Sequence, residues 1–207
     1  MKSLRALATG VSFLCVGGVL ALAGISKLLE RDEFKSAASV LVPEPSSTNQ
    51  GLYFPLTEFE RLQSPLILSN VAASLDLNER WGEKYNRGQA LSDSETEERI
   101  KRHLELRNVP NTRFIQIITY DDDPKEAANL ANAIAQKYSE FRRDESQRRA
   151  AELDERRVIT DPMVIVIDRA IPEFKPVRPN RYLAGALLGC GMFLMMVGIV
   201  GLGARQG

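Results

Sequence analysis

The sequence predicts an α+β protein in which two terminal transmembrane helices flank one membrane-proximal domain. Two uncharged apolar stretches lie near the ends of the chain, Ala6–Ser26 with 21 residues and Tyr182–Ala204 with 23. Nearly all charge lies between them. The intervening patterns run in the order strand, helices, strand, long helix, strand, which is typical of helices covering a small sheet.

Each apolar stretch is long enough to span a bilayer. A hydrocarbon core about 30 Å thick needs roughly 20 apolar residues at a helical rise of about 1.5 Å per residue. A chain that crosses twice places both tails on one side and its middle on the other. We therefore expect cytoplasmic tails at 1–5 and 205–207, membrane helices at 6–27 and 182–204, and one extracytoplasmic domain at 28–181.

A cleaved signal peptide is the alternative for the first stretch. Lys2 and Arg5 form a basic start, and Ala21-Leu22-Ala23 is typical of a cleavage site. The apolar run, however, is longer than the 7–15 residues of a usual signal peptide and continues to Ile25. This length favours a retained membrane helix.

Small residues mark a packing face on each expected span. Gly17 and Ala21 lie four residues apart in the first, and Gly185 and Gly189 form a GxxxG pair in the second. Such spacing lets helix backbones approach closely, although glycine is common in membrane helices generally. We expect these four residues to pack membrane helices.

The first half of the domain begins with a strand over Glu33–Val42, before a polar loop. Thr57 and Glu60 predict a capping box for a short helix, and Ser64 with Pro65 predicts the start of a second. After Trp81, expected in the core, residues 82–90 read as a loop. Ser92 and Glu95 predict another capping box, for a charged helix ending near Asn108.

The second half begins with a β-prone strand over Thr112–Tyr120. Asp123 and Pro124 are typical of a helix start, because an aspartate caps well and proline suits the first turn. An apolar stripe follows at helical spacing: Ala127, Leu130, Ala131, Ile134, Tyr138 and Phe141. We expect this long helix to continue as a charged extension over Arg142–Arg157, before a buried strand over Met163–Ile167.

Three prolines, Pro172, Pro176 and Pro179, precede the second span. Proline fixes φ and favours extended geometry at the residue before it. These prolines predict a semi-rigid strut into the membrane, with an ordinary stiff linker as the alternative.

The composition favours no catalytic chemistry. All 27 acidic residues but only 24 of the 27 basic ones lie between the apolar stretches, which argues against a nucleic-acid partner. His103 is the only histidine and is expected to be solvated, so metal ligands are scarce. Cys15 and Cys190 fall inside the apolar stretches and read as packing residues. We expect no cofactor or metal, and the family resemblance given next implies no enzyme activity.

Several segments, in this order between two terminal spans, resemble the Wzz-type polysaccharide chain-length determinants, the co-polymerases of bacterial envelopes. They are Glu60–Leu68 with Val71 and Leu75–Leu77, Phe114–Ile118, Asp123–Asn132 with Tyr138, Ala170–Asn180, and Gly185 with Gly189. The resemblance implies a homo-oligomeric scaffold in the bacterial inner membrane. It also implies contact with a polysaccharide polymerase or export machinery, and influence on the length of O-antigen, capsule or exopolysaccharide.

The coiled-coil helix of many family members is reduced here to Arg142–Arg157, a departure from the family that bears on its control of chain length. The alternative function is a transmembrane adaptor that activates a separate cytoplasmic tyrosine kinase. The short tails at 1–5 and 205–207 favour the co-polymerase. A third interpretation is a glycan-binding domain in which the sugar stacks on aromatic side chains, namely Trp81, Tyr85, Tyr53 and Phe54.

Overall fold

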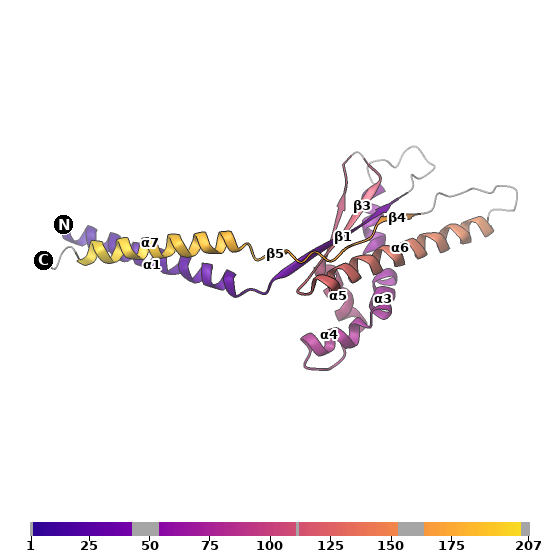
Figure 1. The fold of residues 1–207 in the computed structure, drawn as a ribbon, viewed down its shortest axis with the longest axis horizontal. Coiled ribbons are helices and arrows are strands. Elements are labelled where there is room, and N and C mark those ends of the chain that lie inside the picture. Colours follow the sequence, from indigo (N-terminus) through magenta and orange to yellow (C-terminus); the bar gives the residue numbers. More distant parts are fainter. Residues whose placement is uncertain (1, 43–53, 111, 153–163, 204–207) are drawn as a thin grey trace. The chain divides into compact units, whose positions relative to one another are not determined.

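The computed structural model describes residues 2–42, 54–110, 112–152 and 164–203 (Figure 1). The protein is α+β and divides into two compact units. The helix-pair unit comprises Met1–Glu33 and Pro176–Gly207, and the folded unit comprises Phe34–Lys175.

The helix-pair unit contains two apolar helices, α1 (Lys2–Leu29) and α7 (Arg181–Gly203), and a short strand, β5 (Pro176–Arg178). The helices are antiparallel, because Gly17 lies against Gly191 whereas Gly24 lies against Ala184. Lys2 of α1 and Gly203 of α7 therefore lie at one end of this pair, and Leu29 and Arg181 lie at the other (Figure 1).

The folded unit is built on a small antiparallel sheet. Its strands are β1 (Glu33–Leu41), β2 (Leu104–Asn108), β3 (Phe114–Asp121) and β4 (Ile165–Asp168), in the spatial order β2-β3-β1-β4. In β1, Ser36, Ala38 and Val40 are buried while the residues between them are partly exposed. This alternation, with period two, shows that one face of the sheet is covered and the other is open.

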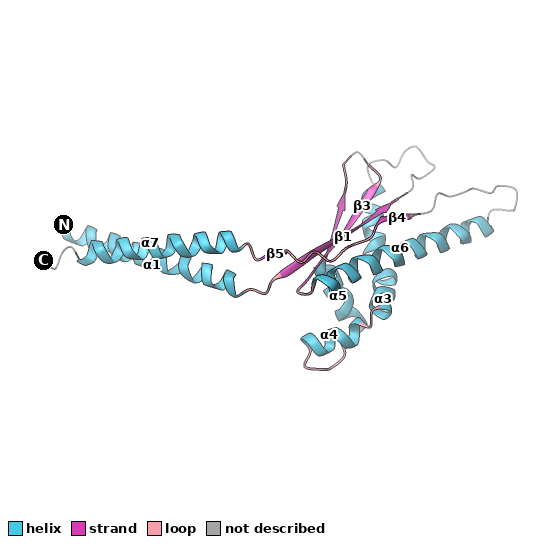
Figure 2. Ribbon diagram, viewed as in Figure 1, coloured by secondary structure: helices cyan, strands magenta, loops and turns pink. Residues whose placement is uncertain are grey.

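Helices cover the buried face (Figure 2). Helices α5 (Asp93–His103) and α6 (Pro124–Glu152) lie against the strands. Helix α3 (Pro65–Ser74) packs on both of them, α4 (Leu77–Tyr85) packs on α3 and α5, and α2 (Phe54–Leu62) packs on α3. Ala127, Ala131 and Ala135 of α6 are buried, and their small side chains allow the helix to lie close to the sheet. At this contact the Thr119 hydroxyl donates a 2.6 Å hydrogen bond to the carbonyl of Ala127.

Most predicted starts of elements are confirmed. Ser64 occupies the cap of α3 and Pro65 its first turn, although the serine side chain donates and accepts no capping bond. Ser92 and Glu95 form both bonds of the capping box of α5. The Asp123 carboxylate accepts a 2.8 Å bond from the Lys125 amide at the start of α6.

Four local predictions were wrong. Helix α2 begins at Phe54, so Thr57 lies inside it and is no cap. Gly82 belongs to α4, where the backbone of Gln89 and Ala90 folds against it and leaves no room for a side chain. The charged helix ends at His103, because the following residues pair with β3 as strand β2.

The fourth concerns the last strand. It begins at Ile165 and is only half buried: Val164 and Val166 face the core, as predicted, whereas Ile165 and Ile167 alternate with them on the open face and are exposed. The predictions for Met163 and for residues 153–157 lie outside the described residues.

Candidate functional site

The contact between α1 and α7 is built from small residues. A Cβ added to Gly17 would lie 2.7 Å from the Gly191 carbonyl oxygen, and one added to Gly191 would lie 2.6 Å from the Ala21 nitrogen. Ala21 is itself buried. The helices are thus in backbone contact, and van der Waals packing of this kind is what associates helices in lipid, where burial of apolar surface gives no driving force.

The outer surface of the pair is apolar and uncovered. Large side chains lie exposed along both helices, among them Val19, Leu22, Phe193, Met196 and Val200. Only 17% of the apolar window of each helix is buried, so neither is the core helix of a globular domain. Residues Val11–Leu29 and Arg181–Val200 are long and apolar enough to cross a membrane.

The other predicted packing pair lies elsewhere. A Cβ added to Gly185 or Gly189 would meet no atom within 4 Å, so neither glycine contacts α1. Cys15 and Cys190 are also exposed, which corrects the expectation that they pack inside. Packing on α7 instead involves Ala184, Leu188, Gly191 and Met195.

Ion pairs lie at the end of the helix pair from which the chain continues. Arg181 donates two hydrogen bonds to the Asp32 carboxylate, at 2.8 and 2.7 Å. Arg178 lies 3.5 Å from Glu33, and Lys27 lies 2.8 Å from Glu30. The charges begin where the apolar helices end, as expected for helices whose ends reach a membrane surface.

The three prolines straddle the division between the units. Pro172 belongs to the folded unit, Pro176 opens β5, and Pro179 is buried shortly before α7. Of the three, only Pro176 lies in a strand, where its fixed φ suits extended backbone. The stiffness of the segment stays a prediction.

Just before Pro172, a clamp fixes the chain to the folded unit. The Asn132 side chain of α6 donates to the Ala170 carbonyl at 3.0 Å and accepts from the Ala170 amide at 2.8 Å. The Ser36 hydroxyl of β1 donates to the Ile171 carbonyl at 3.0 Å. We call these residues, Asn132, Ser36, Ala170 and Ile171, the backbone clamp.

A buried polar pair joins α2 to α6. The hydroxyl of Tyr138, fully buried, donates to the carboxylate of Glu58, which is 2% exposed. Arg61 lies 2.8 Å from that carboxylate and Arg142 lies 3.9 Å from it. Burial first, and the adjacent Glu58 second, raise the pKa of Tyr138, so its hydroxyl stays protonated and remains a donor.

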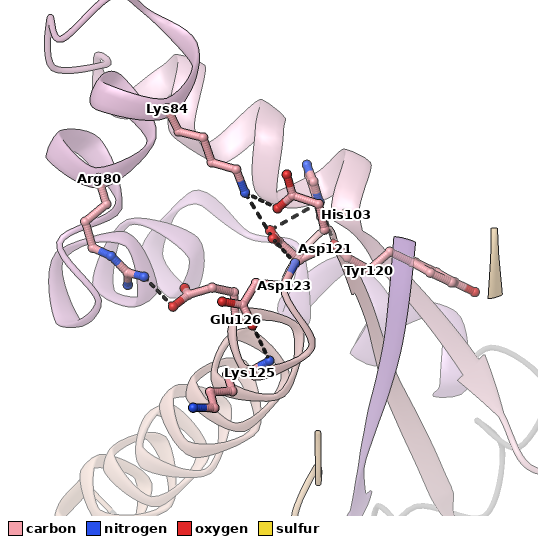
Figure 3. Close-up of polar contacts among 9 residues, drawn as sticks. Arg80, Lys84, His103, Tyr120, Asp121, Asp123, Lys125 and Glu126 are labelled. Carbon is pink, nitrogen blue, oxygen red and sulfur yellow. Dashed lines mark hydrogen bonds and ion pairs between the residues drawn. The ribbon is translucent and has the colours of Figure 1, made fainter. Parts of the chain in front are cut away.

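A second polar cluster lies where β3 meets α6 (Figure 3). Lys84 of α4 donates to Asp121, at 3.2 Å, and to Asp122. The Asp121 carboxylate also accepts a 3.1 Å bond from the Asp123 amide. Next to this cluster, Arg80 of α4 pairs with Glu126 in the first turn of α6. These bonds hold α4 to the start of α6.

His103 belongs to the same cluster, which corrects the expectation that it is solvated. Its Nδ1 lies 2.5 Å from the Tyr120 carbonyl oxygen, a geometry in which the nitrogen donates, and its ring stacks on Trp81 with centroids 5.7 Å apart. Trp81 is buried as predicted and offers no open face to a sugar.

The electrostatics of this cluster are those of a structural ion pair. Burial, and then a hydrogen bond with Asp122, raise the pKa of Asp121. For Lys84, burial opposes the ammonium form, but bonds to Asp122 and Tyr85 and the charge of Asp121 outweigh it and raise the pKa. Within the described ranges no three His, Cys, Asp or Glu side chains gather as metal ligands. The cluster joins elements, and nothing in it singles out a nucleophile.

Neither a scan of protein-family models nor a search of curated proteins finds a match for this chain. The resemblance to the chain-length determinants therefore depends on the order of the quoted segments alone.

Several of these residues were not predicted from the sequence to take part in a contact. On α1 the small residues 17 and 21 are followed at helical spacing by Gly24, a continuation that could have been found. The pairing of Tyr138 with Glu58, 80 residues earlier in the chain, has no local signal. The same is true of Asn132 and Ala170, 38 residues apart.

Proposed function

We propose that this chain is a two-pass membrane scaffold that regulates the chain length, assembly or export of a bacterial surface polysaccharide. In this role α1 and α7 cross the inner membrane, both termini are cytoplasmic, and the folded unit lies outside the cytosol. The scaffold acts by associating with further copies of itself and with the polymerase or export machinery. It performs no catalysis.

The observation that carries the membrane part of this proposal is the antiparallel packing of α1 and α7. Their backbones touch at Gly17 and Gly191, and apolar side chains cover their outer surface. In water such a surface would be costly to expose, whereas hydrocarbon is its natural solvent. Ala21, the first residue of the cleavage-like site, and Gly24, just after it, lie in this contact, which favours retention of the first helix.

The polysaccharide part is supported by the order of the segments in the sequence. The described side chains form two polar clusters, around Glu58 and Asp121, and in both the polar groups bond to one another.

Deletion of the coding sequence tests the function directly. Surface polysaccharide from the deletion strain, separated by size on a gel, should show a changed distribution of chain lengths, and the full-length chain supplied in trans should restore it. An unchanged distribution would remove the polysaccharide role. Recovery of a cytoplasmic tyrosine kinase with the purified protein would instead favour the adaptor.

A further inference from the structure

Tyr182 presents its ring outward at the start of α7. The side chain is 93% exposed and directly follows Arg181, the first residue of the helix. A tyrosine ring is apolar over its body but carries a polar hydroxyl at its tip, so it suits a boundary where one end meets hydrocarbon and the other meets water. Tyrosine is for this reason enriched where membrane helices reach the bilayer surface.

Tyr182 lies one residue inside the level at which charge begins on both helices. Gly24 of α1 contacts Ala184 of α7, and the two helices are antiparallel. Three residues further along each helix towards this end, Lys27 therefore lies at about the level of Arg181. After Arg181, α7 contains no acidic or basic residue. The change from charged to apolar surface thus falls at the ring of Tyr182.

The length of α7 places this level at the edge of a bilayer. Val200, the last residue of the candidate span, comes eighteen residues after Tyr182. At a helical rise of about 1.5 Å per residue, the two lie about 27 Å apart along the helix. The hydrocarbon core of a bilayer is about 30 Å thick. With Val200 near one boundary of the core, Tyr182 lies near the other.

The charges next to Tyr182 are paired within the helix-pair unit. Arg181 donates to Asp32 at 2.7 Å, and Lys27 lies 2.8 Å from Glu30. Because each of these cations is neutralised by a carboxylate, this level of the pair gains little from anionic lipid. The group that it offers to the lipid is the amphipathic ring of Tyr182, and the contact of that ring does not depend on lipid charge.

We propose that Tyr182 is an interfacial lipid contact of the helix pair. Its ring lies against the outermost part of the acyl chains, and its hydroxyl lies among the headgroups of the leaflet reached by Arg181. This inference depends on the proposed membrane crossing. Lipid is favoured over a second protein because the side chain is exposed on an apolar helix at the level where a span of this length leaves the hydrocarbon.

Depth-dependent quenching of tryptophan tests the contact in the full-length protein. The chain is reconstituted in phosphatidylcholine vesicles that carry bromine either near the headgroup end or near the terminal end of the acyl chains. Tyr182→Trp is compared with Phe193→Trp, an exposed position eleven residues further into α7. The signal of native Trp81, buried in the folded unit, is subtracted. A second set of vesicles contains phosphatidylglycerol as well.

We expect bromine near the headgroups to quench position 182 more strongly than bromine near the chain ends, and the reverse order at position 193. The ratio of shallow to deep quenching should differ by roughly two-fold or more between the two positions. Adding phosphatidylglycerol should leave both ratios unchanged. Quenching at 182 only in vesicles that contain phosphatidylglycerol would contradict a contact that is independent of lipid charge.

Failure of this contact can be distinguished from failure of the membrane crossing. Quenching at 193 with none at 182, where aqueous acrylamide quenches instead, would place the ring in water and overturn the inference alone. Protection of position 182 from both bromine and acrylamide would show that protein covers it, which would also overturn the inference. No quenching at 193 would overturn the membrane crossing and this inference with it.

Discussion

The Tyr138 hydroxyl stabilises the fold by donating a hydrogen bond to the buried carboxylate of Glu58. Replacement by phenylalanine leaves Glu58 with one hydrogen bond fewer in a site almost closed to water. An unsatisfied buried acceptor costs about 1–3 kcal/mol. We expect Tyr138→Phe to lower the free energy of unfolding of the full-length protein in detergent by about that amount.

The matched control is Tyr120→Phe. The Tyr120 hydroxyl donates to Glu105 at 2.6 Å, but the Glu105 side chain is 39% exposed, so water can replace the lost donor. We expect a loss of under about 1 kcal/mol there. Equal losses for the two variants would contradict the importance assigned to burial of Glu58.

Asp121 makes the stability of the folded unit depend on pH, and Lys84 limits that dependence. Because the pKa of Asp121 in the fold lies above its ordinary value of 3.8, the stability it contributes is complete below 3.8 and is lost as the pH rises through the raised pKa. The ammonium of Lys84 opposes this loss. In Lys84→Met the pKa of Asp121 rises further, so the variant should fall increasingly below the wild type from about pH 4 to pH 7.

Unfolding measured across this pH range checks the prediction. Lys137→Met is the control, because Lys137 pairs with Glu140 at the surface, 2.8 Å away. A constant difference between Lys84→Met and the wild type at every pH would show that Lys84 acts through packing and not through the charge of Asp121.

At the scale of elements, the effect of a substitution on the packing of α1 against α7 depends on whether the glycine that is replaced lies in the contact. Gly17→Leu places a side chain where the Gly191 carbonyl and the Met195 backbone already lie, so the helices must separate. Gly18→Leu points into open space and serves as the control. We expect Gly17→Leu to lower the melting temperature of the protein in detergent and Gly18→Leu to leave it unchanged.

Disulfide cross-linking gives a second readout of the same contact. Cysteines placed at Ala21 and Leu188, in a background without Cys15 and Cys190, should cross-link with Gly18→Leu present and fail to do so with Gly17→Leu. Equal cross-linking with both substitutions would contradict the observed helix contact.

The backbone clamp is formed by side chains of two elements, Asn132 of α6 and Ser36 of β1. Asn132→Ala removes both bonds to Ala170, one of which protects the Ala170 amide. Amide hydrogen exchange at residues 170 and 171 should then accelerate by about ten-fold or more. Gln136→Ala on the same helix removes only a surface bond to Glu140 and should not change that exchange. Unchanged exchange in Asn132→Ala would mean that other contacts hold the segment.

Element starts could be predicted from the sequence because their causes are local. The capping box of Ser92 and the Asp123 start of α6 each depend on residues within three positions. The strand β2 could not, because Leu104 and Leu106 continue a charged helix in sequence and become a strand only by pairing with β3. Gly82 was likewise predicted to lie in a loop. It lies in α4 instead, where its lack of a side chain leaves room for the backbone of Gln89 and Ala90.

The candidate site was predictable in part for the same reason. Gly17 and Ala21 lie in the helix contact, and their spacing on one helix is visible in sequence. Gly185 and Gly189 have the same spacing but do not contact α1. Spacing identifies residues on one face of a helix, but it does not show which helix packs against that face. Contacts across long separations, such as that of Asn132 with Ala170, require the fold.

At the scale of the whole molecule, the account requires both termini on one side of a membrane and residues 34–175 on the other. Accessibility of single cysteines measures this most directly. In a background with Cys15 and Cys190 replaced by alanine, Ser94→Cys, exposed on α5, is compared with Lys2→Cys near the N-terminus. A maleimide that cannot cross membranes is added to intact spheroplasts of the native cell and, separately, to lysed ones.

We expect labelling of position 94 in intact spheroplasts and labelling of position 2 only after lysis. Labelling of position 94 only after lysis, or a purified chain that begins after Ala23, would contradict it.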